Sequence, residues 1–167
     1  MKCTCGLFVI GLGLALAGCG PAEPAAPDTS TADQALARRV EFFGAAARVP
    51  GITWRASGLG VRIITPGTGV EPKNSDRIRL HYTGRLKDGH VFDDTRAKNR
   101  PAEFEVGRLI PGLAAGVTAL KPGGHAEFFI PPSLGYGSMK VGDIPPVSGL
   151  IFDVELLAVN PEPASKP

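Results

Sequence analysis

The stretch HYTGRLKDGHVFDD, residues 81–94, contains two strand-like runs joined by a turn. Asp88-Gly89 is a strong hairpin signal, because both residue types tolerate the backbone conformations that tight hairpin turns need. The run before it, residues 76–84, alternates apolar and polar residues and so predicts a strand with one buried face. The return strand is unusual, since Asp93 directly follows Phe92 at a point where the pattern otherwise indicates a core.

Short apolar runs punctuated by glycine and proline continue on both sides of this hairpin, as expected of an antiparallel β domain. A short helix should begin at Pro111-Gly112, bury Leu113, Val117 and Leu120, and end before the breakers at 121–123. The prediction is an α+β domain over residues 51–160, with a twisted antiparallel β-sheet wrapped around one short α-helix. The predicted strands are 59–65, 76–84, 91–94, 102–106, 125–131 and 150–159.

The amino-terminal end has the pattern of an export signal. Lys2 precedes an apolar run that ends at Gly18, which has the length of a secretory signal and is shorter than the roughly 20 residues of a membrane span. The run ends in Leu16-Ala17-Gly18-Cys19, which resembles the cleavage motif of bacterial lipoproteins. We therefore expect residues 1–18 to be a lipoprotein signal peptide. The alternative is an ordinary cleaved signal with a cysteine nearby by chance.

Cysteine usage agrees with lipidation at Cys19. Cys3 and Cys5 lie inside the segment to be removed and have no partner pair for a metal site, so Cys19 is the one cysteine of the processed chain. Acyl chains on that residue would tether the protein to a membrane without spanning it. Gly20 is not the aspartate of an inner-membrane retention signal. The expected location is the bacterial cell envelope, on the outer membrane facing the periplasm or the surface.

Between the anchor and the domain we expect a flexible linker and one helix. Residues 19–32 are rich in proline, alanine and small polar residues, which cannot bury enough apolar surface to order themselves. Residues 33–50 carry Leu36, Val40, Phe43 and Ala47 at helical spacing. The helix is expected to pack on its own domain in a monomer, the alternatives being a dimerisation arm or a membrane-surface helix. Residues 161–167 should form a disordered tail.

Charge and motif content exclude several functions. The formal net charge is +2, and no basic stripe interleaved with aromatics is present, which argues against nucleic acid as a partner. His81, His90 and His125 are scattered, and each is better explained as a surface or turn residue than as a ligand. The chain has neither a nucleophile elbow nor a metal-binding helix motif, so we expect no cofactor and no metal.

Two connections, residues 107–113 and 131–146, are unexpectedly apolar for loops. Because loops normally run over the surface and are polar, apolar loops indicate that they share a concave binding surface with the sheet. Asp93 would be one of few polar groups there. We assign Phe104, Phe128, Val154 and Leu156 to the core instead. The expected lining is Tyr82, Phe92, Asp93, Leu109, Ile110, Leu113, Leu134, Tyr136, Ile144 and Phe152.

Four motifs resemble the FKBP-type peptidyl-prolyl cis–trans isomerases: HYTGRLKDGHVFDDT (81–95), GRLIPGL (107–113), LGYG (134–137) and the IPP and LIFDVELL runs within 144–157. The likeness extends over residues 57–159. It implies an isomerase of X–Pro bonds whose partners are proline-containing polypeptides and, as inhibitors, macrolides such as tacrolimus and rapamycin. It further implies catalytic roles for Tyr82, Phe92, Asp93, Ile110, Leu113, Tyr136 and Phe152, and substrate contacts for Leu109, Leu134 and Ile144.

Within that resemblance, the backbone N–H of Ile110 and the hydroxyl of Tyr136 would bond ligand carbonyls. The chain departs from the family pattern at two places. Leu113 stands where the best-known members have a tryptophan floor, and Lys98 stands where the aspartate usually has an arginine partner, with Arg96 or Arg100 as spatial substitutes. Lysine lacks the planar fork of arginine and cannot reproduce a bidentate pairing. The alternative function is a chaperone or binding module that holds proline-containing segments with little turnover.

Overall fold

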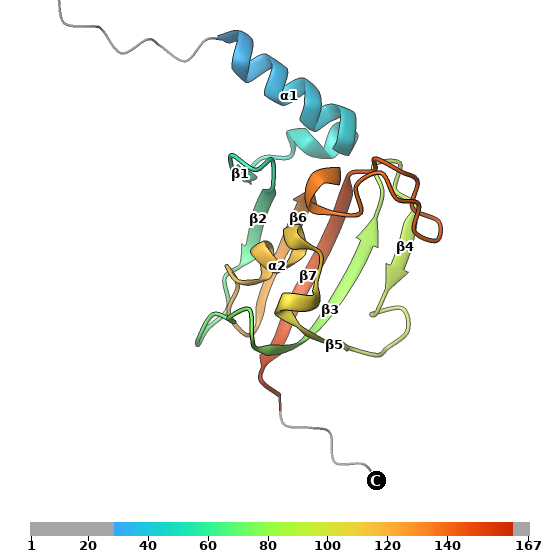
Figure 1. The fold of residues 1–167 in the computed structure, drawn as a ribbon. Helices are drawn as coiled ribbons and strands as arrows, with labels where there is room; N and C mark the ends of the chain where they lie inside the picture. Colours follow the sequence, from blue (N-terminus) through green and yellow to red (C-terminus); the bar gives the residue numbers. More distant parts are fainter. Residues whose placement is uncertain (1–28, 162–167) are drawn as a thin grey trace, which may run out of the picture.

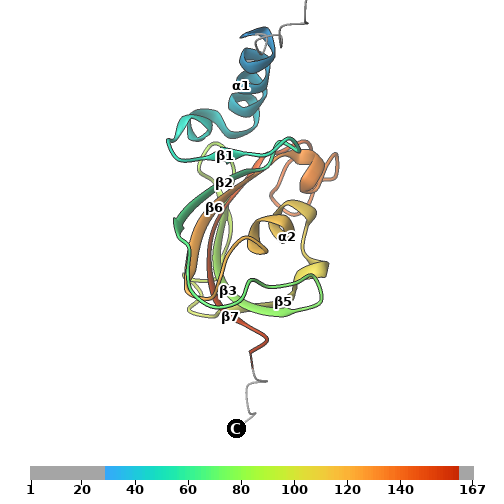
Figure 2. The ribbon, with the colours of Figure 1, turned by 90° about the vertical axis from the view of Figure 1, so that its left-hand side faces the viewer.

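The computed structural model describes residues 29–161, so the predicted signal peptide, Cys19, most of the linker and the tail from residue 162 lie outside the described residues. Seven antiparallel strands form one sheet that curves around the short helix α2 (Pro111–Val117), as Figures 1 and 2 show. This confirms the predicted fold class. The strands are β1 (Thr53–Trp54), β2 (Gly60–Thr65), β3 (Arg77–Arg85), β4 (Val91–Asp94), β5 (Ala102–Glu105), β6 (Gly124–Ile130) and β7 (Leu150–Val159).

The sheet order is β1-β2-β6-β7-β3-β4, and β5 pairs with the first half of β3. Strand β3 is therefore shared: Ile78 lies opposite Phe104 of β5, whereas Gly84 lies opposite Asp93 of β4. The chain between β4 and β5 crosses from one half of β3 to the other. Consequently β4 and β5 pair with different halves of β3, and the concave side of the sheet opens between them.

Alternation along the central strands separates two faces of the sheet. On β7, Leu150, Phe152 and Val154 point into the main core with α2, while Asp153 lies on the other face. The outer face is polar and carries paired charges, including the pairs of Arg62 and Arg85 with Glu127 and of Arg96 with Asp153. Within residues 29–161, no helix is long and apolar enough to cross a bilayer.

At one end of the sheet the outer face is apolar instead. Phe129 of β6 and Ile151 of β7 form a second cluster there with Phe43 and Ala47, and both phenylalanines are almost fully buried. Trp54 of β1 completes the cluster, with its ring centroid 5.7 Å from that of Phe43 and 5.8 Å from that of Phe129. The amino-terminal segment is thus attached to the back of the sheet, opposite α2.

The amino-terminal helix differs from the predicted range 33–50. Helix α1 spans Thr29–Phe43, and a 3-10 turn, η1, follows over Gly44–Arg48. Residues 29–32, expected in the linker, are helical because the sequence offers no proline or glycine that would stop a helix between residues 28 and 32. The helix ends early because Gly44 has a φ of +59°, the left-handed conformation that terminates α-helices.

Two smaller differences affect the elements near the concave side. Helix α2 ends at Val117 rather than at Leu120, although Leu120 is buried as expected. Strand β5 ends at Glu105, and Val106 begins the 3-10 turn η2 (Val106–Arg108) that leads directly into α2. The 3-10 turn η2 thus places the apolar connection ahead of α2, residues 107–113, at the edge of the concave surface.

Candidate active site

The hairpin at residues 81–94 builds one wall of the site. Tyr82 lies on the inner face of β3, and Phe92 lies on β4. Gly84 makes this arrangement possible, because a Cβ at that position would lie 2.5 Å from Cε2 and Cζ of the Phe92 ring. Phe92 therefore lies across the backbone of β3 and meets Phe152 of β7 edge to face, with 5.6 Å between ring centroids.

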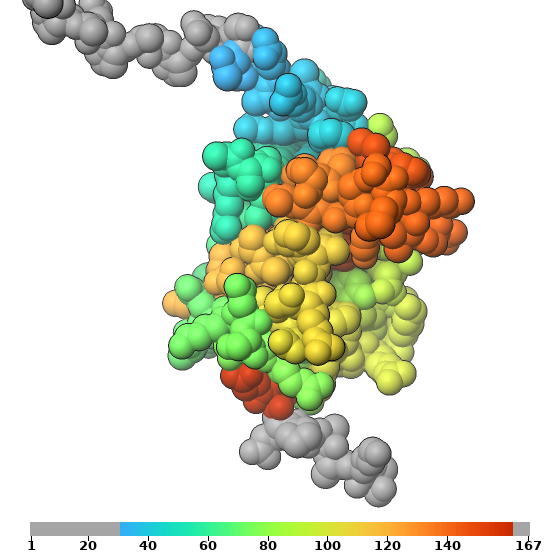
Figure 3. Space-filling model, in the orientation of Figure 1, coloured from blue at the N-terminus to red at the C-terminus, as the bar shows by residue number. Residues whose placement is uncertain are grey.

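These side chains enclose a cavity of about 520 Å³. Its floor is Leu113 of α2, which is 5% exposed, and the Tyr82 ring stands 5.9 Å from that of Phe152. The loop after the 3-10 turn η3 (Pro132–Leu134) overhangs the cavity and projects as the orange segment beside β4 in Figure 3. The cavity is lined by Tyr82, Phe92, Asp93, Phe104, Arg108, Leu109, Ile110, Leu113, Tyr136, Val141, Gly142, Asp143, Ile144 and Phe152.

Asp93 is held by three groups of its own domain. The Tyr82 hydroxyl donates to Oδ2, and the Lys98 ammonium contacts Oδ1 at 2.6 Å. The backbone N–H of Asp94 also donates to Oδ1, at 2.9 Å. Lys98, followed by the Tyr82 hydrogen bond, lowers the pKa of the Asp93 carboxyl below its usual value. Burial, followed by the bond to Asp93, raises the pKa of the Tyr82 hydroxyl.

Lys98 is therefore the partner of Asp93 in the structure, and Arg96 is not. The Arg96 guanidinium instead contacts Asp153 at 2.8 Å and Glu155 at 3.4 Å on the outer face of the sheet. The Lys98 side chain is 66% exposed, so solvent screens its attraction to Asp93, and the ion pair stabilises the fold only weakly. Its contact orients the carboxylate and lowers the pKa of the Asp93 carboxyl.

Two hydrogen-bond donors at the cavity have no acceptor of their own. Within residues 29–161, no hydrogen bond uses the backbone N–H of Ile110 or the hydroxyl of Tyr136. The Ile110 carbonyl, in contrast, accepts from Leu113 and Ala114 at the start of α2. The cavity thus combines apolar walls with two donors placed at its edge, which suits a ligand that presents an apolar ring and carbonyl oxygens.

Nine of the ten predicted pocket residues line this cavity, and Leu134 does not. Leu134 ends η3 and packs against the main core, because the turn directs the chain over the inner face before the loop begins. Phe104 packs against the main core, as expected, and also lines the cavity, since β5 covers only half of β3. The sequence analysis also missed Arg108, Val141, Gly142 and Asp143, whose positions in the connecting segments were the one available signal.

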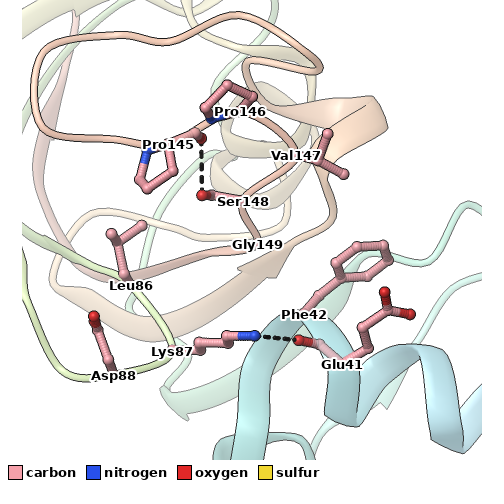
Figure 4. A pocket seen from close by; sticks show the side chains of 10 residues that line it. All are labelled: Glu41, Phe42, Leu86, Lys87, Asp88, Pro145, Pro146, Val147, Ser148 and Gly149. Carbon is pink, nitrogen blue, oxygen red and sulfur yellow. Dashed lines mark hydrogen bonds between the residues drawn. The ribbon is translucent and has the colours of Figure 1, made fainter.

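A second cavity, of about 260 Å³, lies between the end of α1, the β3–β4 turn and the far side of the same overhanging loop (Figure 4). Lys87 from the turn donates to the backbone carbonyl of Glu41 at 3.1 Å. Ser148 in the loop donates to the carbonyl of Pro145 at 2.8 Å. The amino-terminal helix therefore contacts the hairpin next to the loop that covers the main cavity.

The main cavity offers binding rather than nucleophilic or metal chemistry. It contains no cysteine or serine that could act as a nucleophile, and both of its paired polar groups, Tyr82 and Asp93, already bond one another. In the described part of the chain, no three His, Cys, Asp or Glu side chains come close enough together to hold a metal ion. An apolar cavity with unused donors at its lining can accommodate a ligand that presents carbonyl oxygens beside an apolar ring.

Comparison with known proteins identifies the family. Residues 69–157 match the FKBP-type peptidyl-prolyl cis-trans isomerases, and the chain belongs to this family. It is 43% identical over 128 residues to an FKBP-type 22 kDa peptidyl-prolyl cis-trans isomerase of Escherichia coli K12, covering 75% of this chain and 62% of that protein. It is 38% identical over 140 residues to the outer membrane protein MIP of Legionella longbeachae, covering 83% of this chain and 60% of that protein.

Solved structures agree with the sequence match. The crystal structure of FkpA from Escherichia coli superimposes with a TM-score of 0.70 at 37% identity, over 80% of this chain and 63% of that one. AtFKBP13 superimposes with a TM-score of 0.60 at 32% identity, over 64% of this chain and 97% of that one. The chain spans less than two thirds of the length of the two curated relatives compared here. The resemblance drawn from the four motifs is confirmed.

Proposed function

We propose that this protein is a peptidyl-prolyl cis–trans isomerase that accelerates rotation about X–Pro bonds in exported proteins. The observation that carries the proposal is the apolar cavity between Tyr82, Phe92 and Phe152 with two unused donors, the Ile110 N–H and the Tyr136 hydroxyl, at its edge. A pyrrolidine ring fits the apolar part, and the flanking peptide carbonyls fit the donors.

Such a cavity can catalyse without a covalent step. Rotation about a peptide bond costs about 18–20 kcal/mol because amide resonance is lost, and uncatalysed X–Pro exchange takes tens to hundreds of seconds. The twisted amide has less charge separation than the planar one, so dry apolar walls favour the transition state over the ground state. A 10⁴-fold acceleration needs only about 5.4 kcal/mol of such differential binding.

In this proposal Asp93 is a positioning residue and not a general base. The pKa of the Asp93 carboxyl is lowered and the pKa of the Tyr82 hydroxyl is raised, so both shifts move these groups further from titration near neutral pH. Neither group exchanges a proton readily near neutral pH, which is where general acid–base catalysts need their pKa. The carboxylate instead fixes the Tyr82 ring against the proline pocket through the hydrogen bond between them.

We place the protein at the bacterial cell envelope, attached through lipid on Cys19. The lipoprotein-like motif at residues 16–19 supports this location, as does the similarity to a protein named an outer membrane protein. Proline-containing polypeptides reaching that compartment would be the substrates. Macrolides such as tacrolimus and rapamycin would compete for the same cavity, with the shape of the floor at Leu113 setting their affinity.

The test of activity is cis-to-trans exchange of short X–Pro peptides, with the chain from residue 19 onward carrying Cys19→Ser. Asp93→Ala and Tyr136→Phe variants are measured beside it. Acceleration that falls in both variants is the expected result and assigns catalysis to this cavity. Absence of acceleration, with no binding of a proline peptide, would contradict the proposal. Membrane attachment is tested separately, by fractionating cells that express the full chain or Cys19→Ser.

A second function, holding of proline-containing segments with little turnover, has one observation in its favour. The loop over the cavity exposes Met139, Val141 and Val147, with Met139 64% exposed. Exposed apolar side chains around a binding cavity suit contact with unfolded polypeptide. Binding of proline peptides without acceleration of exchange would select this function over isomerisation.

A further inference from the structure

Arginines in this protein divide into two groups by their partners. Six arginines, on β2 and β3, just after β4 and in η2, each contact a carboxylate within 4.0 Å. In contrast, five arginines form no ion pair within residues 29–161: Arg38 and Arg39 of α1, Arg48 of η1, Arg55 after β1, and Arg100 between β4 and β5. The paired group comprises Arg62, Arg77, Arg79, Arg85, Arg96 and Arg108.

Three of these five arginines, Arg38, Arg39 and Arg55, line one cavity, which we call the arginine pocket. It has a volume of about 350 Å³ and lies between α1 and the segment after β1, with Phe42 and Pro131 as apolar walls. Two of the three are held in place: the Arg39 guanidinium stacks 4.6 Å above the Trp54 ring, and Arg55 Nη1 donates to the Ala115 carbonyl at 3.3 Å. Three arginine side chains therefore border one hollow, and no carboxylate of the described chain forms an ion pair with them.

Like charges gathered in this way repel one another unless an anion lies between them. The nearby carboxylate of Glu41 does not serve, because Glu41 lines the other cavity, beside Lys87. Guanidinium groups bind phosphate oxygens through paired N–H donors, and the apolar walls suit a ligand that carries hydrocarbon next to its charge. These are the properties of a phospholipid head group.

We propose that the arginine pocket docks on an anionic phospholipid surface. Nine residues, 20–28, separate Cys19, the lipid-bearing residue of the proposed function, from Thr29, where α1 begins. The ten Cα–Cα steps from residue 19 to residue 29 can span at most about 35 Å when fully extended, so the anchor keeps the start of α1, the helix that carries Arg38 and Arg39, near the membrane. The inference rests on the proposed lipid anchor for bringing the pocket close to a membrane. The arrangement of charges around the pocket does not depend on that anchor.

Docking at this place would fix the orientation of the isomerase domain. Helix α1 lies at one end of the sheet, and the carboxyl-terminal end of β7 lies at the opposite end (Figures 1 and 2). A basic surface at the α1 end would hold that end toward the membrane, with each arginine near the surface adding to the attraction. The proline cavity, which α1 does not line, would remain open to solvent.

The test uses the chain from residue 19 onward with Cys19→Ser, so that no lipid chain can bind by itself. Its partition onto vesicles of phosphatidylcholine alone is compared with partition onto vesicles that also contain phosphatidylglycerol. Trp54 is the one tryptophan of the chain and lies beneath Arg39, so its emission reports on the pocket. We expect binding to the anionic vesicles only, with a shift in Trp54 emission and loss of binding at high salt.

Two variants test the assignment to the pocket. Arg38→Glu changes an arginine with no partner in the described chain and should lower partition onto anionic vesicles by about tenfold or more. The control, Arg100→Glu, makes the same charge change in the segment between β4 and β5 and should leave partition unchanged. Thermal unfolding of both variants shows whether each is folded, and Arg38→Lys should retain most of the binding if Arg38→Glu loses stability.

Several outcomes would overturn the inference. Equal binding to neutral and anionic vesicles would show that the anionic head groups are not recognised. An equal loss of partition in Arg38→Glu and Arg100→Glu would show that the arginine pocket is not the binding site. A Trp54 response to inorganic phosphate or to an acidic peptide, without vesicle binding, would make the pocket a site for small anions or protein partners instead. Peptide isomerisation is assayed in solution, and lipidation is assayed by mass spectrometry. Failure of either proposed function can therefore be distinguished from failure of the domain to dock on vesicles.

Discussion

Asp93 has both carboxylate oxygens engaged by groups of its own domain. Tyr82 donates to Oδ2, and both Lys98 and the backbone N–H of Asp94 donate to Oδ1. These three contacts fix the orientation of the carboxylate. Its position after Phe92, which looks misplaced in a core-forming strand, follows from a need to hold the Tyr82 ring at the cavity wall.

Lys98→Met is expected to raise the pKa of the Asp93 carboxyl, because Lys98 is the largest cause of its depression. A carboxyl with a lowered folded-state pKa contributes stability above its unfolded pKa and loses that contribution as the pH falls through the folded value. The variant should therefore lose the Asp93 contribution at a higher pH than the parent protein. NMR titration of the Asp93 carboxyl carbon checks this.

Arg100→Met is the matched control, since it removes an exposed cation from the same segment without touching Asp93. Its titration curve should overlay that of the parent. Overlay of the Lys98→Met curve as well would contradict the assigned cause, and Lys98→Arg should restore the low pKa.

Gly84→Ala should damage the cavity without adding any polar group. The new Cβ would lie 2.5 Å from the Phe92 ring and 3.1 Å from Cε1 of Phe152, so Phe92 must move. Displacing a wall by about 1 Å can cost up to roughly 100-fold in rate, and a loss of about tenfold or more in kcat/KM is expected. Thr83→Ala, the neighbouring change on the outer face of β3, serves as the control; unchanged kcat/KM in Gly84→Ala would show that Phe92 does not shape the site.

Among the elements, α1 is attached by its last turn and not by its whole length. Phe43 is 1% exposed in the cluster with Phe129 and Trp54, whereas Leu36, two turns earlier, is 39% exposed. The apolar spacing that predicts an amphipathic helix is the same at both residues, but the sheet supports only one end. The helix therefore packs on its own domain, as expected, through a much shorter segment than the pattern indicates.

Phe43→Ala should lower the free energy of unfolding by about 3–5 kcal/mol, the usual cost of removing a buried phenylalanine. Leu36→Ala is the control and should cost less than about 1 kcal/mol, because its side chain is already partly in water. Urea unfolding followed by Trp54 fluorescence measures both, since Trp54 packs directly on Phe43. Equal losses in the two variants would mean that α1 packs along its length.

At the scale of the whole molecule, the sheet separates two cores. The inner face packs on α2 and carries the proline cavity, while Phe129 and Ile151 on the outer face pack on the amino-terminal segment. Consecutive residues of one strand, such as Phe128 and Phe129, therefore belong to different cores. The amino-terminal segment is therefore connected to the cavity through the strands of the sheet and through its contact with the β3–β4 hairpin.

Removal of residues 1–50 should lower stability more than activity. The truncation exposes Phe129 and Ile151, so the free energy of unfolding should fall by roughly 3–6 kcal/mol. The cavity lining includes no residue of the removed segment, so kcat/KM for short X–Pro peptides should stay within about twofold at temperatures where the domain is folded. Thermal unfolding and the exchange assay on the same preparation check both. A large rise in KM would show that α1 supports the overhanging loop.

The sequence by itself determined the class of fold, the hairpin at residues 81–94 and nine of the ten predicted pocket residues. Local turn chemistry and strict alternation are properties of neighbouring residues, so they can be read directly from the chain. Leu134 packs against the main core and does not line the cavity, whereas Phe104 contacts both, because only the path of a loop or the width of a neighbouring strand decides what faces a cavity.

Tertiary structure alone decided between the candidate partners of Asp93, the end of α1 at Phe43 and the placement of three arginines around one hollow. The resemblance put Lys98 at the partner position and left Arg96 and Arg100 as spatial substitutes, and the structure shows Lys98 in contact with Asp93. The choice depends on which face of the sheet each side chain reaches and on which carboxylates are already there. The contacts of Arg96 with Asp153 and Glu155 join residues far apart in the chain, and their geometry exists only once the sheet has closed around its core.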